Sequence, residues 1–176
     1  EFASLCSQTV SLEDYNFSSD IKQRVVIYEG DNIRSLISTP QALDLKTELH
    51  HCIKEGPGVV VVRQAFQDMK VIDMATEIFQ EIIDEEKTSD KHRGDHFAKA
   101  GENERIWNAL QKFCERDTET FIDYYNNPVL CFVTEAWLGP FFQMTSQVNI
   151  VKPGGQAQKP HRDYHLGFQE NSLVSE

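Results

Sequence analysis

A Pro-Gly-Gly turn at residues 153–155 separates two extended segments near the end of the chain. Residues 141–152 alternate apolar and polar side chains as a strand does, and residues 158–168 have the character of a second extended segment. This pattern predicts the opening hairpin of a β-structure. The residues before it have mainly helical spacing. We therefore expect an α+β chain in which a helix-rich part, residues 24–140, leads into the first strands of a sheet.

The helix-rich part divides into short elements bounded by Pro, Gly and Asn signals. The spacing of apolar residues predicts helices over about residues 40–55, 68–87, 104–114, 118–125 and 128–138, and strands over residues 24–28 and 58–63. The second strand is rich in valine and is expected to be buried.

The two ends of the chain and one internal stretch are more polar. Residues 1–23 are expected to form a loosely held arm, and residues 169–176 a polar tail. The densest charge cluster, residues 84–105, is either a solvated loop or a lid over an active site.

Composition limits the class of protein and its partners. The chain has 176 residues, which suits a single domain, and its net charge of −11 argues against a nucleic-acid or anionic membrane partner. No apolar run approaches the roughly 18 residues of a membrane-spanning helix. The four cysteines lie far apart without a Cys-x-x-Cys pair. We therefore expect reduced thiols and a cytoplasmic protein with a small-molecule substrate.

His161 and Asp163 are the residues that point most directly to chemistry. Side chains two apart on a strand project from the same face, with their Cα atoms about 6–7 Å apart, so both can bind one ion. An imidazole and a carboxylate leave room for a third ligand, as in the facial triad of non-haem Fe(II) oxygenases. His165 lies too far along the strand to share that ion, at about 13 Å from His161, so the third ligand should come from another strand. An isolated His-x-Asp pair is also typical of a salt-linked pair on a surface strand.

The surrounding sequence resembles the phytanoyl-CoA dioxygenase family of Fe(II)/2-oxoglutarate oxygenases. In that family a strand ending in Lys-Pro is followed by a loop with Gly or Pro and then by a His-x-Asp strand, often continued by an aromatic residue or a second His. This chain has Lys152-Pro153, Gly154-Gly155 and His161-Arg162-Asp163-Tyr164-His165, and the resemblance is sharpest over residues 141–168. It implies a double-stranded β-helix (jelly-roll) fold that is incomplete in this chain. It also implies that His161 and Asp163 bind Fe(II), with 2-oxoglutarate and dioxygen as co-reactants.

The resemblance also gives roles to weaker candidates. Gln147 and Asn149 share one face of the strand before the turn, where similar proteins hold cosubstrate or substrate; the other interpretation is that they bond to a neighbouring loop. Lys99 lies in the region where the family places a cosubstrate-binding lysine. His96 and His165 are candidates to orient a ligand or the substrate. For Lys99 and His96, a solvated surface position is the alternative.

The family places a second iron-binding His and a cosubstrate-binding Arg on later strands, but only 13 residues follow Asp163. We therefore expect a fragment or truncated product that does not complete the iron site by itself, with unpaired barrel strands that favour a homo-oligomer. Two other functions stay open. One is a truncated, non-catalytic binding or interaction protein, and the other is a cupin-type metal enzyme that uses His92 or His96 as a further ligand.

Overall fold

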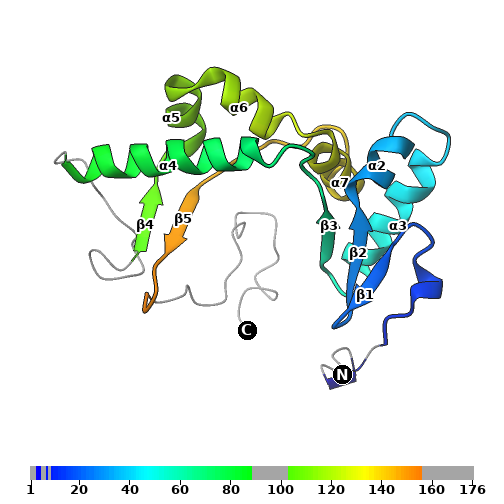
Figure 1. Cartoon of the computed structure of the whole chain (residues 1–176). Coiled ribbons are helices and arrows are strands. Elements are labelled where there is room, and N and C mark those ends of the chain that lie inside the picture. The colour runs from blue at the N-terminus through cyan, green and yellow to red at the C-terminus, as the bar shows by residue number, and fades with distance from the viewer. Residues whose placement is uncertain (1–2, 5–6, 8, 89–102, 156–176) are drawn as a thin grey trace, which may run out of the picture.

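The computed structural model describes residues 3, 4, 7, 9–88 and 103–155. Figure 1 shows two groups of elements, one around the sheet β1-β2-β3 and the other around the strand pair β4-β5. In chain order the elements are η1 (Leu12–Asp14), β1 (Asp20–Lys22), β2 (Val25–Glu29), α2 (Gly30–Leu36), α3 (Ala42–Lys54), β3 (Val60–Arg63), α4 (Lys70–Thr88), β4 (Asn103–Ile106), α5 (Ala109–Arg116), α6 (Thr118–Tyr125), α7 (Pro128–Leu138) and β5 (Val148–Val151). The predicted mixture of helices and strands is confirmed.

The first group is a three-stranded sheet packed against helices α2, α3 and α7 (Figure 1). Strand β2 pairs antiparallel with β1 and parallel with β3. Helices α2 and α3 connect the parallel pair, since parallel neighbours need a crossover. The buried core brings together Tyr28, Leu45, Leu49, Val129 and Phe132. The predicted strand at residues 24–28 and the predicted helix at residues 40–55 are thus confirmed as β2 and α3.

Helix α2, which the sequence pattern does not predict, starts at Gly30. A Cβ atom on residue 30 would lie 2.3 Å from the backbone oxygen of Gln64. Glycine is therefore required where the chain leaves β2 beside the end of β3. Arg34 of the same helix donates hydrogen bonds to the carbonyl oxygens of Gln64 (2.8 Å) and Ala65 (3.0 Å), which fixes the chain as it leaves β3.

Strand β3 is less buried than its valine content predicts. Val60 and Val62 pack against the core of the first group. Val59 and Val61, however, are 46% and 44% exposed. Within the described residues β3 is an edge strand, and only one of its faces is packed. The prediction of a buried strand is wrong for the other face.

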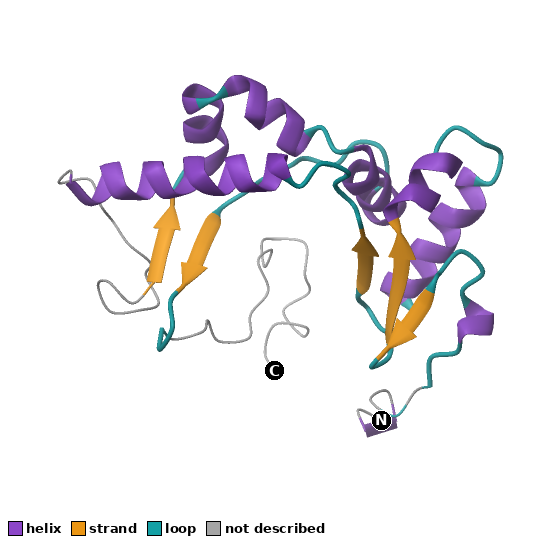
Figure 2. Ribbon diagram, in the orientation of Figure 1, coloured by secondary structure: helices purple, strands orange, loops and turns teal. Residues whose placement is uncertain are grey.

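The second group packs helices α4, α5 and α6 together on the strand pair β4-β5 (Figure 2). At its centre Phe113 is fully buried and contacts the rings of Phe79, Phe121 and Tyr124. The predicted helices at residues 68–87 and 118–125 are confirmed as α4 and α6. The predicted helix at residues 104–114 is wrong over its first turn, because residues 103–106 pair as a strand with β5 and α5 begins only at Ala109.

The expected N-terminal arm is packed over its second half. Tyr15 is buried in the core of the first group. The backbone N–H of Phe17 donates to both carboxylate oxygens of Glu48, each at 3.2 Å. Residues 20–22 form β1. The assignment of residues 15–22 to a loosely held arm is therefore wrong, because two aromatic residues in this polar stretch make core and backbone contacts.

Asn127 ties the start of α7 to the segment that follows β3. Its side-chain Nδ2 donates to the carbonyl oxygen of Ala65 at 2.9 Å. Its Oδ1 accepts from the N–H groups of Val129 and Leu130, which caps α7 as the Asn-Pro signal predicts. Nearby, the rings of Phe66 and Tyr124 lie 5.7 Å apart and add an apolar contact between the groups.

A closed barrel is not seen among the described residues, whose strands form two small separate sheets. The extended segment predicted at residues 158–168 lies outside them. None of the helices in the described part of the chain has the length and apolar character to span a bilayer.

Candidate functional site

The strand pair β4-β5 has one packed face and one outward face. On β5, Val148 and Ile150 pack against the core of the second group, while the alternate residues Asn149 and Val151 are exposed. Gln147, just before the strand, is also exposed. Because strand side chains alternate between faces, Gln147 and Asn149 lie on the outward face, away from the core beneath α4.

Arg105 on β4 joins this outward face. It is the register partner of Asn149, and directly opposite residues of an antiparallel pair project to the same side. The guanidinium carbon of Arg105 lies 4.2 Å from the ring centroid of Trp107, which is two residues further on. The Nε atom of Arg105 is buried and finds no hydrogen-bond acceptor in the described part of the chain. The outward face thus carries the guanidinium group of Arg105. The ring of Trp107 fixes the plane of this group, and its Nε–H is an unused hydrogen-bond donor among the described residues.

Sequence reasoning missed Arg105. Ile106, Leu110 and Phe113 fit a helical spacing, which places Arg105 at the start of the predicted helix and within the charge cluster. No local signal reveals it, because Asn103, Glu104 and Arg105 are all polar and the run lacks the apolar/polar alternation of a half-buried strand.

Glu104 lies on the opposite, packed face of β4. Its side chain is only 4% exposed and receives two ammonium groups on Oε1, from Lys87 at 2.6 Å and from Lys152 at 2.5 Å. Burial raises the pKa of Glu104, but the hydrogen bonds from Lys152 and Lys87 outweigh it, so its pKa lies below the ordinary value. The carboxylate is therefore ionised at neutral pH and links α4, β4 and the end of β5.

The turn predicted at residues 153–155 is confirmed and begins at the same lysine. The N–H of Gly155 donates to the carbonyl oxygen of Lys152 at 2.8 Å. Gly154 has a φ angle of +84°, which favours glycine. In sequence, this turn leads from the outward face of β5 toward His161 and Asp163.

Several predicted site residues lie outside the described residues: His161, Asp163, His165, His96, Lys99 and the alternative ligand His92. Within the described ranges, no group of three or more His, Cys, Asp or Glu side chains is placed to hold a metal ion. Of the predicted set, the structure therefore places only Gln147 and Asn149, and it brings Arg105 beside Asn149.

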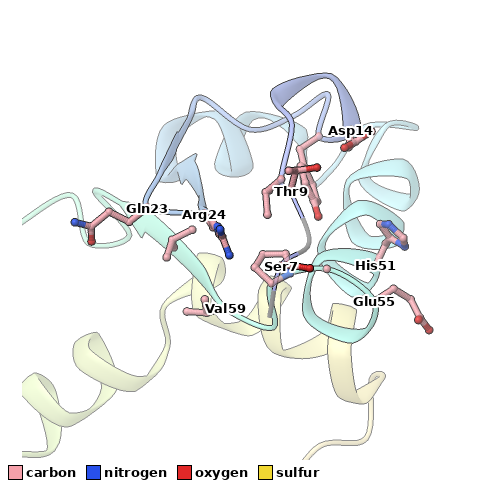
Figure 3. Close-up of a pocket in the computed structure, with 13 residues that line it drawn as sticks. Ser7, Thr9, Asp14, Gln23, Arg24, His51, Glu55 and Val59 are labelled. Atoms are coloured by element: carbon pink, nitrogen blue, oxygen red, sulfur yellow. The ribbon is translucent and has the colours of Figure 1, made fainter. Parts of the chain in front are cut away.

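A cavity of about 850 Å³ lies elsewhere, between the N-terminal segment, the β1-β2 turn and the end of α3 (Figure 3). Its lining combines the acidic residues Asp14 and Glu55 with Arg24 and His51. None of the site residues predicted from the sequence lines it. The cavity is therefore separate from the candidate site on β4-β5.

Comparison with known proteins agrees with the motif. A family model described as phytanoyl-CoA dioxygenase (PhyH) matches residues 46–175, which is more than half of the chain and includes β4, β5, the turn and the His-x-Asp pair. No curated protein matches the chain, and no solved structure does. The extent of the family match settles the assignment: this chain belongs to the phytanoyl-CoA dioxygenase (PhyH) family.

Proposed function

We propose that this protein is an Fe(II)/2-oxoglutarate-dependent dioxygenase that hydroxylates a small organic or acyl substrate. The outward face of β4-β5 binds 2-oxoglutarate in this proposal. The observation that carries it is the placement of Arg105 beside Asn149, on the strand pair that leads in sequence to His161 and Asp163. Family membership supports the class of reaction.

The outward face suits a dicarboxylate. A guanidinium group binds a carboxylate through two parallel hydrogen bonds, and Arg105 has a buried Nε atom without an acceptor among the described residues. The ring of Trp107 holds the guanidinium plane, so little side-chain freedom is lost when an anion binds. The side-chain amides of Asn149 and Gln147 add donors on the same face. Lys99 is the second cation of the proposed cosubstrate site.

His161 and Asp163 would hold Fe(II), and their imidazole and carboxylate donors suit that ion. Fe(II) supplies the site at which dioxygen and 2-oxoglutarate react when all are bound. The protein's own residues bind and orient the co-reactants and exclude water. His96 and His165 orient the substrate in this proposal. A jelly-roll barrel is the fold that we propose around this site.

We also propose that the protein is cytoplasmic. Cys52, Cys114 and Cys131 are free thiols in the structure, and Cys52 is buried. Burial raises the pKa of the Cys52 thiol to about 11, which makes it unreactive at neutral pH. The free thiols support the proposal of a reducing, cytoplasmic environment.

Trp107 provides a direct test, because it contacts the arginine that is proposed to bind the cosubstrate. The chain has two tryptophans, and the ring of Trp137 on α7 lies against that of His50 instead, with the centroids 5.4 Å apart. In a Trp137→Phe variant, fluorescence therefore reports on Trp107 alone. We expect a saturable change on titration with 2-oxoglutarate and Mn(II), and a much weaker change with glutarate, which lacks the keto group. A flat response to 2-oxoglutarate would contradict the proposed cosubstrate site.

A further inference from the structure

A buried ion triplet joins three elements of the second group. Glu104 of β4 receives Lys87 from the last turn of α4 and Lys152 from the residue after β5. Figure 1 shows β4 and β5 side by side, with α4 lying across them. A carboxylate that is 4% exposed needs its partners, because an unpaired buried charge is costly. The position of each lysine is therefore coupled to the position of β4.

The two lysines differ in the structure of the chain around them. Lys87 belongs to the end of a 19-residue helix, whose own hydrogen bonds and apolar face hold it in place. Lys152 begins an exposed turn: its carbonyl oxygen accepts the N–H of Gly155, and Pro153 and Gly154 are exposed. Lys152 is thus fixed at its side chain by Glu104 and closes the turn with its backbone.

We propose that Lys152 is a positioning residue, whose ion pair with Glu104 fixes the turn at residues 152–155 and so the direction in which the chain leaves β5 toward His161 and Asp163. The inference rests on the proposed function, in which those two residues bind Fe(II). Lys152 does not touch iron, cosubstrate or substrate in this arrangement. It acts through the turn.

The chain offers a matched control for this role. Lys152→Met and Lys87→Met each remove one ammonium group from the same carboxylate and leave the other in place. Both variants should fold, because Glu104 keeps a partner. Lys152→Arg restores the charge and tests for rescue.

Two measurements on the full chain separate the alternatives: amide exchange of Gly155 by NMR, and Mn(II) affinity by EPR with saturating 2-oxoglutarate. In Lys152→Met we expect Gly155 exchange to rise and Mn(II) affinity to fall, each by about tenfold or more. Lys87→Met should change each value by less than about threefold, and Lys152→Arg should lie close to the wild type.

Equal effects of the two Met variants on Gly155 exchange or on Mn(II) affinity would overturn the inference, because the lysines would then only stabilise the fold. The inference would also be overturned if Lys152→Met had the same Gly155 exchange and Mn(II) affinity as the wild type. A wild-type chain that does not bind Mn(II) would contradict the proposed function. The comparison of Gly155 exchange would still decide whether Lys152 fixes the turn.

Discussion

Arg105 on β4 and Asn149 on β5 are register partners whose side chains share the outward face of the strand pair. They are 44 positions apart in sequence, so only the antiparallel pairing brings them together. The opposite face of the same strands is packed on the core beneath α4. The strand pair therefore separates a polar binding surface from the apolar contacts that stabilise it.

Replacing Arg105 tests the proposed cosubstrate site. Arg105→Ala should raise the Kd for 2-oxoglutarate by about tenfold to a hundredfold, because a hydrogen bond to a charged group contributes about 1.5–3 kcal/mol. Arg105→Lys keeps the charge but loses the bidentate geometry, so its Kd should lie between those of the wild type and Arg105→Ala. Isothermal titration calorimetry measures all three. Arg116→Ala on α5, which removes contacts to Glu81 and Glu85, is the control and should leave the Kd unchanged. A similar Kd for Arg105→Ala and the wild type would refute this role.

Replacing Glu104 tests the buried ion triplet. Glu104→Ala leaves two ammonium groups at a packed face without their carboxylate. We expect a loss of about 2–4 kcal/mol in the free energy of unfolding, reduced from the usual cost of a broken buried pair because both lysines also reach solvent. Glu81→Ala removes a 61% exposed side chain that faces Arg116 and should cost less than about 1 kcal/mol. Urea denaturation distinguishes the two, and equal losses would contradict the buried pairing.

Glu48 should make stability depend on pH. Burial raises its pKa above the ordinary value of 4.5, although hydrogen bonds from the Phe17 backbone and the Tyr28 hydroxyl favour the ionised form. Between the unfolded and folded pKa values the folded state binds more protons, so the contribution of Glu48 falls as the pH rises through that window.

The variant Glu48→Gln removes this titration. The free energy of unfolding of the wild type, relative to the variant, should therefore decrease from about pH 4.5 toward neutral pH. Urea denaturation at several pH values measures the difference. A difference that stays constant, or that grows in favour of the wild type as the pH rises, would contradict the raised pKa.

Phe113 should dominate the core of the second group. It is fully buried and packs against the rings of Phe79, Phe121 and Tyr124. Phe113→Ala should therefore lower the free energy of unfolding by about 3–5 kcal/mol through lost burial and a residual cavity. Phe141→Ala, at a residue that is 98% exposed, should change it by less than about 0.5 kcal/mol. Comparable losses for the two variants in urea denaturation would show that this aromatic cluster does not hold the group together.

Local signals in the sequence are enough to predict most helices and two strands. The proline and glycine boundaries of α3 and the long amphipathic pattern of α4 are properties of each segment alone. The Asn127-Pro128 cap of α7 is predictable for the same reason. These elements carry their own start and stop signals, so no distant partner is needed to recognise them.

Elements that depend on distant contacts are missed. Strand β4 is a strand because it pairs with β5, and its final residue, Ile106, also fits a helical spacing with Phe113. Helix α2 begins at Gly30. Glycine is required there because of the nearby Gln64 backbone oxygen, a contact that only the folded structure reveals. Arg105 is missed as a site residue for the same reason as β4. For Gln147 and Asn149 the alternation of the strand indicates a shared face, but it does not indicate their partner.

His161 and Asp163 are central to the proposed function, as the metal-binding part of a site that holds 2-oxoglutarate. The most direct test is EPR titration of Mn(II) into the full chain with 2-oxoglutarate present, for the wild type, His161→Ala, Asp163→Ala and the control His51→Ala. We predict that the wild type and His51→Ala bind Mn(II) alike, and that the His161 and Asp163 variants bind at least about tenfold more weakly. Equal Mn(II) affinity in all four proteins would contradict the proposed metal site.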